Sequence, residues 1–279
     1  MPVRVLGVDV GGDRKGLDLV VMNEGRAVVL TQARASLENV TTVLRDLRPQ
    51  IVAIDSPPAW NAGGRSRRTE RQLAELGIST FPTPSAVGGE QPFFEWMKAG
   101  MAVFALAAEH GYRLDTTGRR GRRAIEVFPY GTSVVLSGGL KPHGMRAKDW
   151  RERILRAHGV ATDALRTSDQ VDAALAALTG VLVGEGRATY LGDGAEGVIV
   201  LPVTAPLPRY RPGPTPADDE DRLFRYCACG CGRQVVPPRE FVSGHDGRYK
   251  SMLWGLVREG RRAEQELQRR RWEPPPEVR

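Results

Sequence analysis

The chain has 279 residues, of which 41% are hydrophobic and 26% are charged, a balance typical of a globular protein with one large domain and room for a small one. No stretch approaches the roughly 18 apolar residues of a membrane helix, and the sequence leads straight into a strand, so we expect a cytoplasmic protein with no signal peptide and no membrane partner. The net charge of +7 favours a polyanionic partner, although only five of the 40 basic residues are lysine and an arginine excess often reflects genomic base composition.

Hydrophobic periodicity predicts an α/β domain over most of the chain. The predicted strands are 3–10, 17–22, 26–30, 51–55, 123–128 and 197–201. The predicted helices are 36–47 with Ser36 as N-cap, 69–76, 92–111, 148–159 and a last one within 167–186. The opening order is strand-strand-strand-helix-strand, which places the strand 51–55 parallel to the strand 3–10 and beside it.

The composition changes after this domain. Residues 1–203 form the predicted domain, and 204–222 form a stiff, acidic linker, with six prolines between residues 202 and 216. A cysteine and histidine module is expected over 223–253. The remainder, 254–279, is a charged tail that can form a helix.

Four aspartates stand where this topology brings chain segments together. Asp9 lies near the end of the first strand and Asp55 ends the fourth, so both are expected in the crevice at the carboxyl edge of the sheet. Asp169 and Asp172 are three residues apart at the start of the last helix and share one of its faces. Several carboxylates in one crevice repel each other unless divalent cations bind, and hard oxygen ligands select Mg²⁺ or Mn²⁺. We expect two such ions, the usual clamp for in-line attack on a phosphodiester.

The start of the last helix carries two further signals. Thr167 and Gln170 fit a capping box, which begins the helix just before the two aspartates. The residues that follow on the same face are small, and this would let the helix approach the sheet closely. They are Ala173, Ala176 and Gly180.

A fifth acid, Glu126, lies in the strand 123–128 and is a further catalytic candidate. The acids also have ordinary interpretations. Glu126 could form an ion pair with Arg122 or Arg123, and Asp169 could serve only to complement the positive end of its helix.

The order of these motifs resembles the ribonuclease H-like superfamily, and the D-x-x-D helix looks most like its Holliday-junction resolvase branch. More narrowly, GVDVGG, AIDSPP, TERQL…FPTPS, IEVFP, DQVDAALAA and GVIVLP together resemble the domain family DUF429, described as predicted ribonuclease H-fold nucleases. The resemblance spans roughly residues 3–203. It implies a mixed five-stranded sheet with flanking helices and a metal-dependent nuclease. The matching acids are Asp9, Asp55, Asp169 and Asp172, with Glu126 as a further one, and resolvase-like relatives imply a homodimer.

Two other functions stay open at this stage. GVDVGG also resembles the first phosphate loop of actin-like sugar kinases, which would need a second phosphate loop, and GDGAEG at 192–197 is the nearest candidate. The third interpretation is a module of the same fold that binds nucleic acid or protein without catalysis.

Two arginine-rich loops are predicted to flank the ends of the active-site strands. Arginine there would bind the phosphates of DNA or RNA, the main source of nucleic-acid affinity, and no base-reading motif accompanies it. A solvated surface loop is the alternative. The residues are Arg65, Arg67, Arg68 and Arg71 in the first loop, and Arg119, Arg120, Arg122 and Arg123 in the second.

The three cysteines lie within five residues of each other, so they cannot link distant parts of a fold and are typical of metal ligands. Three thiolates and one imidazole suit tetrahedral Zn²⁺. The predicted ligands are Cys227, Cys229, Cys231 and His245. Asp246 is a possible substitute, and a site with fewer ligands or an unstructured tail are the alternatives.

Overall fold

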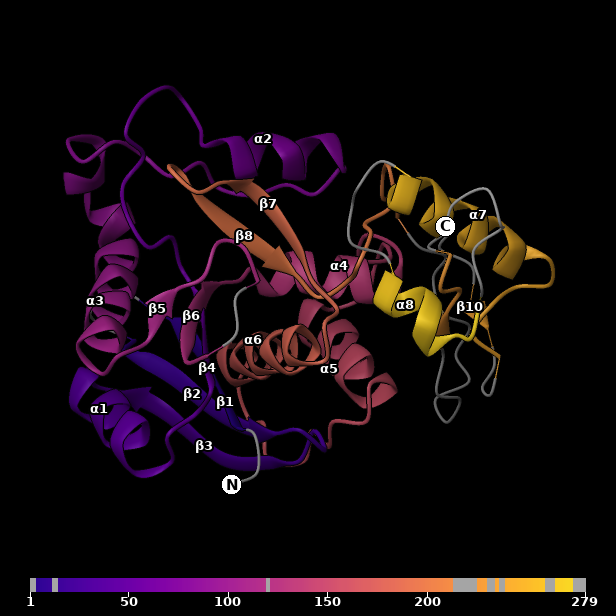
Figure 1. Cartoon of the computed structure of the whole chain (residues 1–279). Helices are drawn as coiled ribbons and strands as arrows, with labels where there is room; N and C mark the ends of the chain where they lie inside the picture. The colour runs from indigo at the N-terminus through magenta and orange to yellow at the C-terminus, as the bar shows by residue number, and fades with distance from the viewer. Residues whose placement is uncertain are drawn as a thin grey trace.

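A computed structural model describes residues 4–11, 15–118, 121–212, 225–229, 234–235, 239–258 and 264–272. In this part of the chain one large sheet forms the centre, helices cover both of its faces, and a smaller unit built from the C-terminal residues lies beside it (Figure 1). No helix among the described residues is both long and apolar enough to cross a membrane.

The strands of the large sheet lie in the order β3-β2-β1-β4-β6-β8-β7, with β5 paired to β6. β1 to β3 are antiparallel neighbours, whereas β4, β6 and β8 run parallel to β1. The bounds are β1 Arg4–Val10, β2 Leu17–Asn23, β3 Val28–Ala35, β4 Ile51–Asp55, β5 Arg113–Leu114, β6 Arg123–Glu126, β7 Thr189–Asp193 and β8 Gly197–Leu201. The order and direction of β3-β2-β1-β4-β6 are those of a ribonuclease H-like sheet, as the sequence predicted, and β8 and β7 extend it.

The helices divide between the two faces of this sheet. α1 and α3 pack on one face, and α4, α5 and α6 pack on the other. The bounds are α1 Leu37–Asp46, α2 Arg68–Glu75, η1 Gly88–Glu90, η2 Pro92–Phe94, α3 Glu95–Glu109, α4 Pro129–Ser137, α5 Ala147–Ala157 and α6 Ser168–Gly184. Ser36 caps α1 as predicted. The predicted helix 92–111 is divided, because its first turn is the short 3-10 helix η2.

α6 lies against β1 at backbone distance. A Cβ atom added to Gly7 of β1 would lie 2.1 Å from the carbonyl oxygen of Ala173 and 2.4 Å from the nitrogen of Ala177. One added to Gly180 would lie 2.4 Å from Val5 Cγ1. Ala176 is buried in the same helix, so the small residues of α6 do allow the close approach that the sequence predicted.

Two predicted boundaries are wrong. Within 204–212, predicted as an extended linker, Tyr210 is 3% exposed and packs into the core of the large domain. The predicted end of the metal-binding module at residue 253 falls inside the helix α7, His245–Arg258. Leu267 and Trp272 from the predicted tail pack in the same small core as Cys227, so that core extends beyond the predicted module. The other elements there are β9 Arg225–Tyr226, β10 Gln234–Val235 and α8 Glu264–Arg269.

Candidate metal centre

Three aspartates form one row across the centre of the sheet. Asp9 on β1 is in register with Asp55 on the parallel strand β4 and with Asp18 on the antiparallel strand β2. Side chains in register on neighbouring strands project from the same face. Asp9 lies two residues beyond Gly7, so the row projects from the face that α6 covers.

α6 brings two more aspartates to this row. Thr167 and Gln170 form the predicted capping box: the Thr167 hydroxyl accepts from the Gln170 N–H at 3.0 Å, and the Gln170 side chain accepts from the Thr167 N–H at 3.3 Å. The helix therefore begins at Ser168, and Asp169 and Asp172 lie in its first turns, where the partial positive charge of a helix terminus favours acids.

The electrostatics of Asp9 show that the aspartates converge. Burial and then the negative charges of Asp55, Asp172, Asp169 and Asp18, in that order of strength, together raise the pKa of Asp9 from its ordinary value of 3.8 to about 9. Burial and Asp172 also raise the pKa of Asp55 well above its ordinary value. Aspartates from β1, β2, β4 and α6 thus form one partly buried group of carboxyls, which we call the aspartate cluster: Asp9, Asp18, Asp55, Asp169 and Asp172.

Asp18 is a member of this cluster that the sequence analysis did not identify. It is 6% exposed, and burial, followed by the charge of Asp169, raises its pKa. The stretch LDLVVM does contain a sign of a buried acid, because Asp18 stands between two leucines of an apolar strand. That sign could be connected to the site only through the register of β2 on β1, which places Asp18 beside Asp9.

Arg151 is the second residue near the aspartate cluster that the sequence analysis did not identify. It lies on α5, and its Nη1 donates to Asp172 Oδ2 at 2.6 Å, with the two side chains 18% and 16% exposed. The pKa of Asp172 is raised to about 6, chiefly by burial, although the charge of Arg151 limits the rise. An arginine on an amphipathic helix carries no local signal of such a contact, because the contact depends on how α5 packs against α6.

The donor chemistry of the aspartate cluster suits a hard divalent cation, although no three of its carboxylates lie as close together as the ligands of one ion, a spacing that only Cys227, Cys229 and His245 reach among the described residues. Its ligand atoms are carboxylate oxygens, which Mg²⁺ and Mn²⁺ prefer. Asp172 Oδ1 and Asp18 Oδ1 are buried and accept no hydrogen bond from the described residues. A buried carboxylate oxygen without a partner is costly, and a bound cation would remove that cost.

Glu126 does not join this cluster. It is in register with Ile54, one residue before Asp55, so strand alternation directs it to the opposite face of the sheet. Its two oxygens accept from Arg67 at 2.9 and 2.6 Å, and Arg67 also binds Glu70 at 3.0 Å. The predicted pairing of Glu126 with Arg122 or Arg123 is replaced by this buried pair with Arg67.

The arginine loops need two corrections. Arg67 is 2% exposed and bonded to two carboxylates, so it is not available to a phosphate. The second loop leads into the start of β6, and Arg123 is in register with Ile51 at the start of β4. Asp55 lies four residues farther along β4, about 13 Å away along the strand. The second loop therefore lies at the edge of the sheet opposite the aspartate cluster.

The remaining arginines divide by position. Arg65, Arg68 and Arg71 are exposed in or just after the loop that follows β4, at the edge where the cluster lies. Arg122 lies over the ring of Tyr112, 5.5 Å from its centroid, and Arg123 pairs with Asp115 at 3.4 Å. Arg119 and Arg120 lie outside the described residues.

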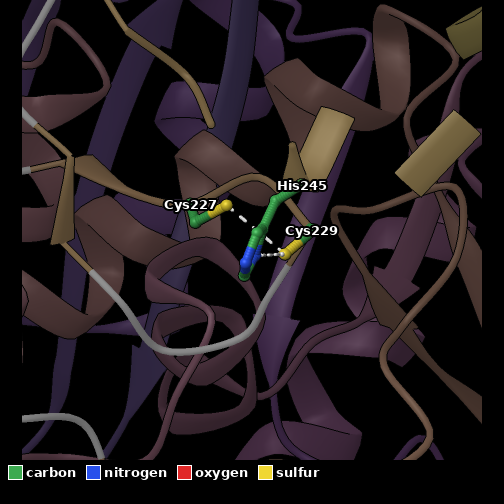
Figure 2. Close-up of side chains that lie close together, drawn as sticks. All are labelled: Cys227, Cys229 and His245. Carbon is green, nitrogen blue, oxygen red and sulfur yellow. Dashed lines mark hydrogen bonds between the residues drawn. The ribbon is translucent and has the colours of Figure 1, made fainter. Parts of the chain in front are cut away.

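A second candidate metal site lies in the C-terminal unit. Sulfur atoms of Cys227 and Cys229 and a ring nitrogen of His245 all lie within 4.8 Å of one another (Figure 2). Cys229 Sγ is 3.1 Å from His245 Nδ1, and the backbone N–H of Val242 donates to Cys227 Sγ at 3.2 Å. Two thiols and an imidazole form a soft donor set suited to Zn²⁺. The predicted ligand Cys231 lies outside the described residues.

The segment 192–197, the candidate second phosphate loop of a kinase, is the tight turn between β7 and β8. The side chain of Asp193 accepts from the N–H groups of Ala195 and Glu196 at 3.0 and 2.9 Å. The turn therefore uses the backbone donors that a phosphate would need, and this arrangement weighs against the kinase interpretation.

Comparisons with known proteins give a family and some similar solved structures. The similar solved structures include RuvC of Thermus thermophilus, with 18% identity over 66% of this chain and 97% of that chain at a TM-score of 0.38. They also include T. thermophilus RuvC in complex with Holliday junction substrate, with 22% identity over 63% of this chain and 91% of that chain at a TM-score of 0.33. No curated protein matches the sequence. A family model described as "Protein of unknown function (DUF429)" matches residues 7–196, which include the second half of β1, all of β4 and α6, and the aspartate cluster. The chain belongs to the DUF429 family.

Proposed function

We propose that this protein is a nuclease that hydrolyses phosphodiester bonds of nucleic acid and depends on Mg²⁺ or Mn²⁺. The observation that carries the proposal is that Asp9 and Asp55 lie in register on neighbouring parallel strands, and that Asp169 and Asp172 at the start of α6 lie near enough for their charges to raise the pKa of Asp9. Surface charges avoid this arrangement, because each carboxylate raises the free energy of the others. Clusters of this kind are found where they serve a ligand or a reaction.

The residues of the chain have separate roles in this proposal. Asp9, Asp55, Asp169 and Asp172 would hold the cation, and Arg151 would orient Asp172. When bound, a divalent cation lowers the pKa of the attacking water and neutralises charge on the phosphate. The reaction adds one water molecule across a P–O bond and leaves one hydroxyl end and one phosphate monoester end.

The test uses the purified full-length protein with Mn²⁺ on single-stranded, duplex and branched DNA and RNA, beside the Asp9→Asn variant. Cleavage by the wild type that the variant lacks is expected. Equal results for the two proteins, whether both cleave or neither does, would contradict the proposal. The second of these outcomes would favour a binding module without catalysis.

The exposed arginines near the cluster are proposed to bind the backbone of the substrate. Replacing Arg65, Arg68 and Arg71 together with alanine should reduce the slope of log affinity against log salt for duplex DNA by about 1 to 3, because each phosphate contact contributes about 0.9. Fluorescence anisotropy at several salt concentrations measures this slope.

The matched control removes three exposed arginines from the opposite edge of the sheet, which makes the same change in net charge. Arg45 lies in the last turn of α1, just before β4, and Arg113 and Arg122 adjoin the start of β6. This control variant should keep the wild-type slope. If both variants lower the slope of log affinity against log salt equally, the net charge of the protein determines binding, and the arginines near the aspartate cluster have no special role.

We also propose that the C-terminal unit holds one structural Zn²⁺, with Cys231 joining Cys227, Cys229 and His245. The small core around Cys227 has few apolar residues, so much of its folding free energy would come from zinc binding. Cys229→Ser should reduce the zinc content below one per chain and expose Trp254 and Trp272 of this unit, seen as a change in tryptophan fluorescence.

Ser251→Ala, an exposed position on α7, is the control and should keep both the zinc and the fluorescence of the wild type. Wild-type protein purified without chelator that contains no zinc would refute this site.

A further inference from the structure

The segment between α2 and α3 exposes two aromatic side chains, Phe81 and Phe93, which we call the aromatic pair. Phe81 is 65% exposed and Phe93 is 57% exposed, and their rings meet edge to face with centroids 5.6 Å apart. Val87, in the same segment, is 79% exposed. Three of the six large hydrophobic side chains that are exposed among the described residues therefore lie within residues 81–93. Such a concentration of exposed apolar surface marks a binding surface.

The backbone of this segment is held in place by buried contacts. The N–H and the hydroxyl of Thr83 both donate to Glu70 Oε1 on α2, at 2.8 and 2.6 Å. Gly89 is buried against the side chain of Trp60, because a Cβ atom added to it would lie 2.5 Å from the Trp60 ring. The exposed position of the aromatic pair is therefore a defined feature of the fold.

The aromatic pair lies toward the same edge of the sheet as the aspartate cluster. A Cβ atom added to Gly100 of α3 would lie 2.0 Å from Ser56 Oγ and 3.6 Å from Val10 Cγ1, and these two residues directly follow the aspartates that end β4 and β1. From there α3 runs to the opposite edge, because it is followed by β5, which pairs with the start of β6. Phe93 precedes Gly100, so it lies about 10 Å away in the other direction, beyond the carboxyl edge.

Exposed arginines adjoin the same segment. Arg71 directly follows Glu70, whose carboxylate holds Thr83, and Phe81 is two residues from Thr83. Residues 81–93 themselves contain one acid, Glu90, and no basic residue. The positive charges around α2 therefore exceed the negative charge of the segment, and the surface suits an anionic partner. The exposed arginines are Arg65, Arg68 and Arg71.

Aromatic rings beside arginines match the chemistry of a single-stranded nucleic acid. Unpaired bases stack on aromatic rings, and the phosphates between them bind arginine. The bases of a duplex are already stacked on each other and offer no free face to such a ring. The centre of a protein–protein interface is poor in charged residues, so arginines beside a small apolar pair favour nucleic acid over a protein partner.

We propose that Phe81 and Phe93 form a stacking site for unpaired bases of a single-stranded nucleic acid, whose phosphates the neighbouring arginines bind. This inference rests on the proposed function and narrows it, because it assigns the enzyme substrates with unpaired bases. The aromatic pair binds the strand at a distance from the aspartate cluster and takes no part in the reaction.

Binding of a fluorescent oligothymidine to the full-length protein tests this inference. Fluorescence anisotropy is measured without added Mg²⁺ or Mn²⁺, so that no cleavage interferes. Phe93→Leu keeps an apolar side chain but removes the ring, and it should weaken binding at least fivefold, the lower end of what stacking of one base contributes. Phe81→Leu should act in the same direction. Phe93→Trp keeps a ring and should keep the affinity of the wild type.

Two further probes separate stacking from backbone contacts. An abasic oligonucleotide of the same length has the phosphates without the bases, and a duplex has its bases paired. The wild type and both leucine variants should bind each of these probes equally well.

Leu114→Ala is the matched control, because Leu114 is an exposed apolar residue on β5, beside the start of β6 at the opposite edge of the sheet. It should keep the wild-type affinity for every probe. If Phe93→Leu does not fold by circular dichroism, Phe81→Leu and Phe93→Trp decide.

Three results would each overturn the stacking site. The first is an unchanged affinity of both leucine variants for oligothymidine. The second is an equal loss of affinity for the abasic probe. The third is a wild-type dimer in sedimentation that Phe81→Leu converts to a monomer without a change in oligothymidine affinity, which would make the aromatic pair an interface between two copies of the chain.

The binding readout is independent of cleavage. Oligothymidine binding that depends on the phenylalanine rings, without cleavage of any substrate, would refute the nuclease and leave the stacking site intact. Cleavage by the wild type together with unchanged oligothymidine binding in both leucine variants would do the reverse.

Discussion

Asp9→Asn should abolish cleavage of nucleic acid, with a loss of about a thousandfold or more. Asp9 lies at the centre of the cluster, between Asp18 and Asp55 in the row and close to Asp169 and Asp172 of α6. An amide in its place removes a charged ligand atom, and the stabilisation that a cation gives to the transition state is worth several kcal/mol. Each 1.36 kcal/mol corresponds to a factor of ten in rate. Single-turnover cleavage with saturating Mn²⁺ measures the loss.

The same substitution should stabilise the fold when no Mn²⁺ is bound. Near neutral pH the folded wild type must take up a proton at Asp9, whose pKa is about 9, whereas a neutral amide needs no proton, so we expect a gain of roughly 2 kcal/mol. Asp46→Asn is the control, because Asp46 is exposed and pairs only with its neighbour Arg45 among the described residues. It should change neither cleavage nor stability by a comparable amount. If Asp9→Asn is inactive because it is unfolded, the prediction that this substitution removes a metal ligand and stabilises the fold is wrong.

The stability gain should depend on pH in a defined direction. The pKa of Asp9 is about 9 in the folded chain against 3.8 in an ordinary environment, so between these values the folded state binds more protons than the unfolded state. The free energy of unfolding therefore falls as the pH rises through this window, and the contribution of Asp9 is complete only below its ordinary pKa. The advantage of Asp9→Asn over the wild type should grow from about pH 5 to about pH 8 in urea titrations without Mn²⁺. An advantage that shrinks with rising pH would contradict the raised pKa.

The parts of the site that the sequence predicted are those fixed by local rules. Asp9 and Asp55 each occur at the end of an apolar strand, and the strand order makes these strands parallel neighbours. The spacing of Asp169 and Asp172 and the capping box at Thr167 determine where α6 begins and which face carries the acids. Periodicity and capping act over a few residues, so one sequence is enough to locate them.

The parts that were wrong or missed depend on register and packing. Glu126 lies one residue out of register with Asp55, and one residue is enough to move a side chain to the other face of a sheet. Arg67 was predicted to bind phosphates from an arginine-rich loop, but its guanidinium lies between Glu70 and Glu126 in the interior. Arg151 reaches Asp172 only because α5 packs beside α6. A local pattern gives no information about such contacts between distant segments.

Gly7→Ala should destabilise the protein by about 3 kcal/mol or more, which lowers the melting temperature by roughly 6–12 °C. The new Cβ would lie 2.1 Å from a carbonyl oxygen and 2.4 Å from a nitrogen of α6, and these are backbone atoms that no change of side-chain rotamer can move away. α6 would have to separate from β1. Differential scanning calorimetry of the full-length protein measures the effect.

The same separation should weaken the proposed metal site, because β1 carries Asp9 and α6 carries Asp169 and Asp172. At temperatures where Gly7→Ala is still folded, its affinity for Mn²⁺ should fall at least tenfold, since the ligands no longer meet. Gly184→Ala is the matched control on α6, with no atom within 4 Å of the added Cβ, and it should be neutral or gain up to about 1 kcal/mol from helix propensity. Wild-type stability and Mn²⁺ affinity in Gly7→Ala would show that close contact between β1 and α6 does not position the aspartates.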